Sequence, residues 1–154
     1  EVTMVSVDET AAVTGSHQIT VQMDQLLSET DFDAFDLLVL PGGMPGTLHL
    51  EDCDGLMEQL DRFYSAGKWV AAICAAPQIF GHRGYLKGRK ATSFPSMEKE
   101  LDGAFVTHGA AEVDGNVITG RGMGCAIDFA LKIIGCLISE EEAAAQAERI
   151  VYER

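Results

Sequence analysis

The stretch VAAICAAPQIFG, residues Val70–Gly81, places a cysteine between two kinds of local structure. Trp69–Ile73 is a short apolar run, the pattern of a strand that is buried on both faces. Downstream, Pro77 suits the first turn of a helix, where the N–H that proline lacks is not needed. We therefore expect Cys74 to lie where a buried strand ends and a helix begins.

Strand and helix patterns alternate along the rest of the chain. We expect strands at Val2–Val7, Ile19–Met23, Asp36–Leu40, Trp69–Ile73 and Arg89–Ser93, and a hairpin of Glu112–Val113 and Asn116–Ile118 around Asp114–Gly115. We expect helices at Glu51–Ala66, from Ala75 to about Gly81, after the glycine-rich turn of residues 120–124, and from a Ser139–Glu142 capping box to near Tyr152. This alternation predicts an α/β fold with a largely parallel sheet covered on both faces, and the absence of a linker predicts a single domain over residues 1–154.

The composition excludes several classes of protein. Hydrophobic residues make up 47% of the 154 residues, enough for one domain with its own core. The 11 Lys and Arg and 24 Asp and Glu give a formal net charge of −13, which repels phosphate backbones and anionic lipids. We expect neither nucleic acid nor a membrane as a partner. No apolar run reaches the roughly 18 residues of a membrane span, and the first residues do not have the pattern of a signal peptide.

The cysteines and histidines do not form a metal-binding pattern. None of the spacings among them gives C-x-x-C or H-x-x-x-H; the residues are Cys53, Cys74, Cys125 and Cys136, and His17, His49, His82 and His108. The chain is large enough to fold without disulfides, so a reducing cytoplasm is the simplest location. We expect no metal and no other cofactor.

The predicted position of Cys74 in the fold favours a reactive thiol, and the other cysteines have no such position. In parallel α/β sheets, ligands bind beyond the carboxyl ends of the strands, and both Cys74 and the Gly42–Gly43 pair follow a predicted strand. Amides at the start of the following helix favour a thiolate over a thiol. The backbone amides of Gly42, Gly43 and Ala75 are positioned to bind an oxyanion that develops on a carbonyl substrate.

The residues around Cys74 also match a nucleophile elbow. This sharp strand-to-helix turn tolerates only small residues two positions on either side of the nucleophile, and these are Ala72 and Ala76. The other cysteines are interpreted as small hydrophobic residues: Cys136 lies on the apolar side of a helix and Cys53 opens one. We predict Cys74 as the only catalytic residue.

Three motifs in this order resemble the ThiJ/PfpI superfamily: LLVLPGGMPG, VAAICAAPQIFG and VITGRGMGCAIDFALKII. The branch that they resemble most is that of the parkinsonism-associated protein deglycases and their bacterial relatives. The resemblance implies a flavodoxin-like three-layer α/β/α sandwich, commonly a homodimer. It implies that Cys74 is the reactive cysteine and that the backbone of Gly42, Gly43 and Ala75 binds the oxyanion.

The chain departs from the family pattern at several positions. In the deglycase branch a glutamate from the first helix bonds the cysteine, whereas this sequence starts at the segment that matches the family's second strand. We expect that strand and glutamate to come from an upstream segment or a separate chain. A histidine of some members falls on Gly103, and nearby His108 is interpreted as a surface residue. Protease-like and glyoxalase-like relatives often have His after the nucleophile, where this chain has Ala75, and no late His supports a glutamine amidotransferase.

Two functions remain open at this point. The first is a cysteine-dependent enzyme, of deglycase, glyoxalase or hydrolase type, acting on small reactive carbonyls or their protein adducts. The second is a redox-sensing or chaperone-like protein in which Cys74 is oxidised to a stabilised sulfinate. A nucleotide site is disfavoured because Gly120, Gly122 and Gly124 do not complete G-x-G-x-x-G, so these glycines are expected to let a helix approach the sheet.

Overall fold

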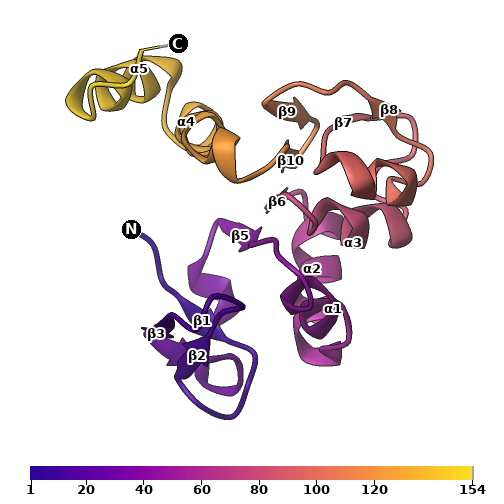
Figure 1. The fold of residues 1–154 in the computed structure, drawn as a ribbon, viewed down its shortest axis with the longest axis vertical. Coiled ribbons are helices and arrows are strands. Elements are labelled where there is room, and N and C mark those ends of the chain that lie inside the picture. The colour runs from indigo at the N-terminus through magenta and orange to yellow at the C-terminus, as the bar shows by residue number, and fades with distance from the viewer. Residues whose placement is uncertain (154) are drawn as a thin grey trace.

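A four-stranded sheet forms the centre of the protein (Figure 1). The structure is a computed structural model that describes residues 1–153, and the strand order is β5 (Leu37–Leu40), β6 (Trp69–Ile73), β10 (Val117–Gly120), β9 (Ala111–Asp114). The first three strands run parallel and β9 is antiparallel at one edge. This confirms the predicted largely parallel sheet. Because β6 lies between β5 and β10, the carboxyl ends of three strands meet beside Cys74.

Helices cover both faces of this sheet. Figure 1 shows α4 (Ala126–Leu137) and α5 (Glu140–Arg149) on one side, and α1 (Gly46–Glu51), α2 (Asp54–Ser65) and α3 (Pro77–His82) on the other. Neighbouring residues of β6 point to opposite faces: Val70 belongs to the larger core with Phe63 and Phe80, and Ala71 to a smaller core with Phe129. This is why β6 is apolar at every position and why the fold has three layers.

Short strands complete the N-terminal part and the edge beside β9. The parallel pairs are β1 (Val5–Ser6) with β4 (Gln25–Leu26) and β7 (Lys90–Ala91) with β8 (Phe105–Val106), and β2 (Ala12–Thr14) forms a hairpin with β3 (Thr20–Gln22). The 3-10 helices are η1 (Leu27–Glu29), η2 (Phe32–Ala34), η3 (Pro95–Glu100) and η4 (Met123–Cys125). The strands predicted at Val2–Val7, Ile19–Met23 and Arg89–Ser93 are therefore too long, because their partners supply only two or three pairing residues.

Several predicted helix and turn boundaries are also wrong. The helix expected over Glu51–Ala66 starts later, at Asp54, because Cys53 has an extended backbone (φ −86°, ψ 96°) and caps α2, and α1 before it was not predicted. The segment expected to start at Ala75 becomes helical at Pro77. The hairpin pairs Asp114 with Val117, so its two loop residues are 115 and 116 rather than 114 and 115.

Only one of the two hydrogen bonds of the predicted capping box forms. The Ser139 hydroxyl accepts a hydrogen bond from the Glu142 amide (3.1 Å), which satisfies one of the free amides at the start of α5. The Glu142 carboxylate bonds Arg149 instead (3.0 Å), and α5 ends at Arg149, before the expected Tyr152. Among the described residues, no helix has both the length and the apolar character that a membrane span requires.

Candidate active site

Cys74 follows β6 directly and has a left-handed backbone conformation, with φ at +65°. For a residue with a Cβ this conformation costs about 1–2 kcal/mol, and such strain persists only where the surroundings enforce it. The Cys74 amide donates to the Gly120 carbonyl (3.0 Å), and the Cys74 carbonyl accepts from the Phe94 amide (2.8 Å). The two neighbouring segments thus hold the sharp turn that the sequence predicts.

Gly42 lies directly against this elbow. A Cβ at position 42 would lie 2.5 Å from the Ile73 carbonyl oxygen, 2.6 Å from the Cys74 Cβ and 2.9 Å from the Ala75 nitrogen. Any side chain there would have to move the strand end or the cysteine, so glycine is required for this close approach. The structure therefore brings Gly42, Cys74 and Ala75 together, as the neighbouring strands predict.

Gly43 faces open space beside the same elbow. Its φ is +97°, and a Cβ on it would meet no atom within 4 Å. Its carbonyl accepts from both the amide (2.8 Å) and the hydroxyl (2.9 Å) of Thr47, a fully buried residue at the start of α1. The amides of Gly42, Gly43 and Ala75 donate to no other protein group in the described part of the chain. These three donors are free to bind a ligand.

The cysteine is flanked by small buried residues. Ala72 and Ala76 are fully buried, as the elbow requires, and Cys74 itself is half-buried. Within residues 1–153, no side chain hydrogen-bonds to Cys74 Sγ. The His108 ring bonds the Glu98 carboxylate (Nδ1 to Oε1, 2.8 Å) and is 59% exposed.

Of the three glycines expected to let a helix approach the sheet, Gly120 has this role, whereas a Cβ on Gly122 would make only an ordinary contact with Phe94 (3.6 Å) and one on Gly124 would meet no atom within 4 Å. A Cβ on Gly120 would lie 2.9 Å from both Ile73 Cγ1 and Phe129 Cδ2, so its absence lets α4 approach the sheet. Arg121 donates from its guanidinium to the His108 carbonyl and from its amide to the Ala110 carbonyl (2.9 Å).

The other cysteines differ from Cys74 in their surroundings. Cys136 packs against the smaller core, and burial raises the pKa of its thiol, with a smaller contribution from the Glu140 carboxylate. Cys53 is the N-cap of α2, without a side-chain hydrogen bond there. Neither lies at the carboxyl end of a strand, where Cys74 lies.

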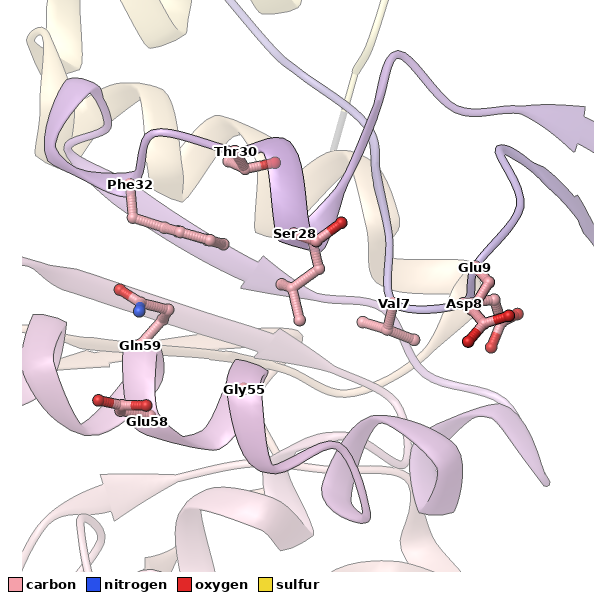
Figure 2. Close-up of a pocket in the computed structure, with 10 residues that line it drawn as sticks. Val7, Asp8, Glu9, Ser28, Thr30, Phe32, Gly55, Glu58 and Gln59 are labelled. Atoms are coloured by element: carbon pink, nitrogen blue, oxygen red, sulfur yellow. The ribbon is translucent and has the colours of Figure 1, made fainter.

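A cavity of about 430 Å³ lies elsewhere, between the N-terminal segment and α2. Figure 2 shows Val7, Ser28 and Phe32 on one side of it and Gly55 and Gln59 on the other. None of the elbow residues lines this cavity. No cysteine or histidine lines it, so the elbow is the better candidate for an active site.

Sequence reasoning missed the groups that hold the elbow in place. These are the Gly120 carbonyl and the Phe94 amide, which lie at least 20 residues from Cys74, and the Thr47 side chain, which bonds Gly43 from the start of α1. Backbone groups carry no residue-specific signal, and Thr47 lies in α1, a helix that the sequence did not predict.

The chain is similar to proteins of one family. The model of the DJ-1/PfpI family matches residues 1–135. The Arabidopsis thaliana protein DJ-1 homolog B is 37% identical over 145 residues, which cover 93% of this chain and 33% of that protein, so the chain spans about a third of that relative. The deglycase PfpI of Pyrococcus furiosus is 38% identical over 119 residues, covering 75% of this chain and 70% of that protein.

A solved structure agrees with the sequence comparisons. The oxidized form of Toxoplasma gondii DJ-1 superposes with a TM-score of 0.94 at 33% identity, covering 100% of this chain and 84% of that one. The fold is therefore the flavodoxin-like α/β sandwich that the three motifs imply, and the resemblance is confirmed. The chain belongs to the DJ-1/PfpI family.

Proposed function

We propose that the protein is a cysteine-dependent enzyme that acts on small reactive carbonyls or on their protein adducts. The observation that carries this proposal is the strained backbone of Cys74, held against Gly42 with the amides of Gly42, Gly43 and Ala75 free. A strained nucleophile beside several unpaired donors is the arrangement that addition to a carbonyl requires.

The proposed chemistry starts with addition of Cys74 Sγ to an aldehyde carbon. The S–H bond breaks as the C–S bond forms, the π electrons of the C=O bond move to oxygen, and the oxygen takes up a proton in place of the one that sulfur loses, which gives a hemithioacetal. The free amides stabilise the negative charge on oxygen during this step. For methylglyoxal, an internal hydrogen shift and reaction with one water then give lactate and return the thiol.

Consumption of methylglyoxal tests this proposal directly. A family member that is 38% identical is named a deglycase, which supports the choice of substrate class. We expect loss of methylglyoxal to be matched by formation of lactate, and prior treatment with iodoacetamide to stop both. Peptide mapping should locate the label on Cys74 before Cys136, whose buried thiol has a raised pKa. Turnover that survives complete labelling of Cys74 would contradict the proposal.

A redox function is the second candidate. The related Toxoplasma gondii structure is of an oxidized protein, and amides that bind an oxyanion are also suited to a sulfinate. Two equivalents of hydrogen peroxide would convert the Cys74 thiolate to a sulfinate with release of two waters. A peroxide titration with peptide mapping should oxidise Cys74 at lower peroxide than Cys136; equal susceptibility would rule out the sensor.

Replacement of Gly42 with alanine tests the close approach of the glycine loop. The added methyl group would overlap the Ile73 carbonyl and the Cys74 Cβ, so the loop must move away from the elbow. Because misplacement by about 1 Å can cost about a hundredfold in rate, we expect kcat to fall by about that factor. Gly46→Ala is the matched control, since its Cβ would meet no atom within 4 Å. Equal kcat values for the two variants would contradict the role of Gly42.

We also propose that a segment outside residues 1–154 completes the site. The family resemblance implies a first strand and a glutamate that bonds the cysteine, and within residues 1–153 β5 pairs on one side only, with β6. Val39 of β5 is 45% exposed, as expected for a strand that lacks a neighbour. Intact-mass measurement of the active sample should reveal added residues or a second chain; full activity from a single 16.6 kDa species would contradict this.

Assembly as a homodimer is a further part of the proposal. The family resemblance implies it, and exposed apolar side chains lie on and beside α4, among them Met123, Ile127, Leu137 and Ile138. Exposed apolar side chains of this kind are typical of a surface that another protein covers. Light scattering coupled to gel filtration should give about twice the chain mass; a mass of one chain would contradict it.

A further inference from the structure

Three segments that leave the elbow meet again at one histidine. α1 follows the glycine loop and ends at Glu51, α3 follows Cys74 and ends at His82, and η3 follows Phe94 and ends at Glu100. His82 Nδ1 lies 2.6 Å from Glu51 Oε1, and His82 Nε2 lies 3.3 Å from Glu100 Oε2. One imidazole thus connects the far ends of all three segments.

Each segment is also fixed at the end nearest the elbow. Thr47 of α1 binds the Gly43 carbonyl through two hydrogen bonds, and the Phe94 amide binds the Cys74 carbonyl. On α3, Gln78 is 4% exposed and donates to the second oxygen of Glu51 (3.3 Å). Each short segment is therefore held at both ends, and movement of its far end moves the elbow or the glycine loop.

We propose that His82 is a positioning residue that sets the spacing between the glycine loop and Cys74 by bridging Glu51 and Glu100. This inference rests on the proposed function of Cys74. Glu51 and Glu100 are both acceptors only, so the complete bridge needs a proton on each ring nitrogen. The bridge is complete in the imidazolium form, and neutral His82 can donate to only one of the two carboxylates.

The charges around His82 favour this protonated form. The Glu51 carboxylate raises the pKa of His82 above its usual range, and Glu100 adds to this effect although partial burial opposes it. His82 in turn lowers the pKa of Glu100, together with Lys99. Arg83, the next residue, bonds Asp61 of α2 and so is directed to another partner.

The direction of the pH dependence follows from these shifts. A histidine with a raised pKa stabilises the folded state fully below about pH 6.5, and this contribution is lost as the pH rises through the raised value. A carboxylate with a lowered pKa contributes above its usual value, and its contribution is lost as the pH falls. The bridge is thus complete at mildly acidic pH and opens as the pH rises through the raised pKa of His82.

Steady-state kinetics of His82→Gln and Glu51→Gln on methylglyoxal test the inference. We expect kcat to fall about tenfold or more with little change in KM, since small errors in position affect the rate more than binding. The alkaline decline of wild-type kcat that comes from His82 should be absent in His82→Gln. Arg83→Gln is the matched control, because it removes a neighbouring ion pair to α2 and leaves the bridge intact. A lowered Tm with unchanged kcat and pH profile in both bridge variants would overturn the inference.

Hydrogen exchange separates failure of this inference from failure of the proposed function. Amide exchange of residues 42–51, followed by mass spectrometry, should be faster in His82→Gln than in wild type and unchanged in Arg83→Gln. If wild type does not consume methylglyoxal but this difference is present, the proposed substrate is wrong and the bridge stands. If exchange of residues 42–51 is the same in all three proteins, the bridge does not hold the glycine loop and the inference is wrong.

Discussion

Cys74→Ala is expected to lower the rate of methylglyoxal consumption by roughly 10³-fold or more, because removal of a covalent nucleophile leaves only binding and the amide donors. Cys74→Ser should be nearly as inactive, since a hydroxyl at the same position is far harder to ionise than a thiol. Cys136→Ala is the matched control and should keep wild-type activity, because Cys136 packs against the smaller core. Similar rates for Cys74→Ala and Cys136→Ala would remove Cys74 from the mechanism.

Stability measurements on the same variants test whether the strain at Cys74 is kept for function. Alanine keeps the Cβ and therefore the left-handed strain, so Cys74→Ala should change the free energy of unfolding by less than about 1 kcal/mol. Cys74→Gly removes the clash of the Cβ with the following carbonyl and should be more stable than Cys74→Ala by about 1 kcal/mol. If Cys74→Gly is inactive but more stable than Cys74→Ala, the backbone of the native site is strained. A glycine variant less stable than the alanine variant would contradict this.

The sequence predicts best the elements whose signal is local and strong. The strand predicted at Trp69–Ile73 has the same bounds in the structure. A strand that is buried on both faces is apolar at every position, so its ends are clear in the sequence. The approach of Gly42 to Cys74 follows from the order of neighbouring strands and from the small residues around the elbow. These features depend on residues that are close in sequence or in adjacent strands.

The features that the sequence did not predict depend on contacts between distant segments. β8 has only two residues, too few to produce a periodic pattern in the sequence. It is a strand because it pairs with β7. The sequence predicts a helix start at Glu51, where α1 ends, and α2 begins only at Asp54, after the extended Cys53. The bridge through His82 joins Glu51 and Glu100, 31 and 18 residues away, and each of the three residues alone resembles an ordinary surface group.

Phe80→Ala is expected to cause the largest loss of stability among the changes considered. Phe80 is fully buried in the larger core on α3, and its ring lies 5.8 Å from that of Tyr85, which stacks on Tyr64 at 3.9 Å. Removing a buried phenyl ring loses its transfer free energy and leaves a cavity, which together cost about 3–5 kcal/mol. For a domain of this size, each kcal/mol corresponds to roughly 2–4 °C, so Tm should fall by roughly 6–20 °C.

Phe105→Ala is the matched control for this prediction. Phe105 lies on β8 with 66% of its surface exposed, so the same chemical change should alter the free energy of unfolding by about 0.5 kcal/mol or less. Urea denaturation of the two variants compares them directly, and a similar slope for both would show that the denatured states match. Because α3 starts three residues after Cys74, Phe80 also anchors the segment that follows the nucleophile. Equal losses in the two variants would mean that α3 is not packed on the core, and the elbow would then lose its support on that side.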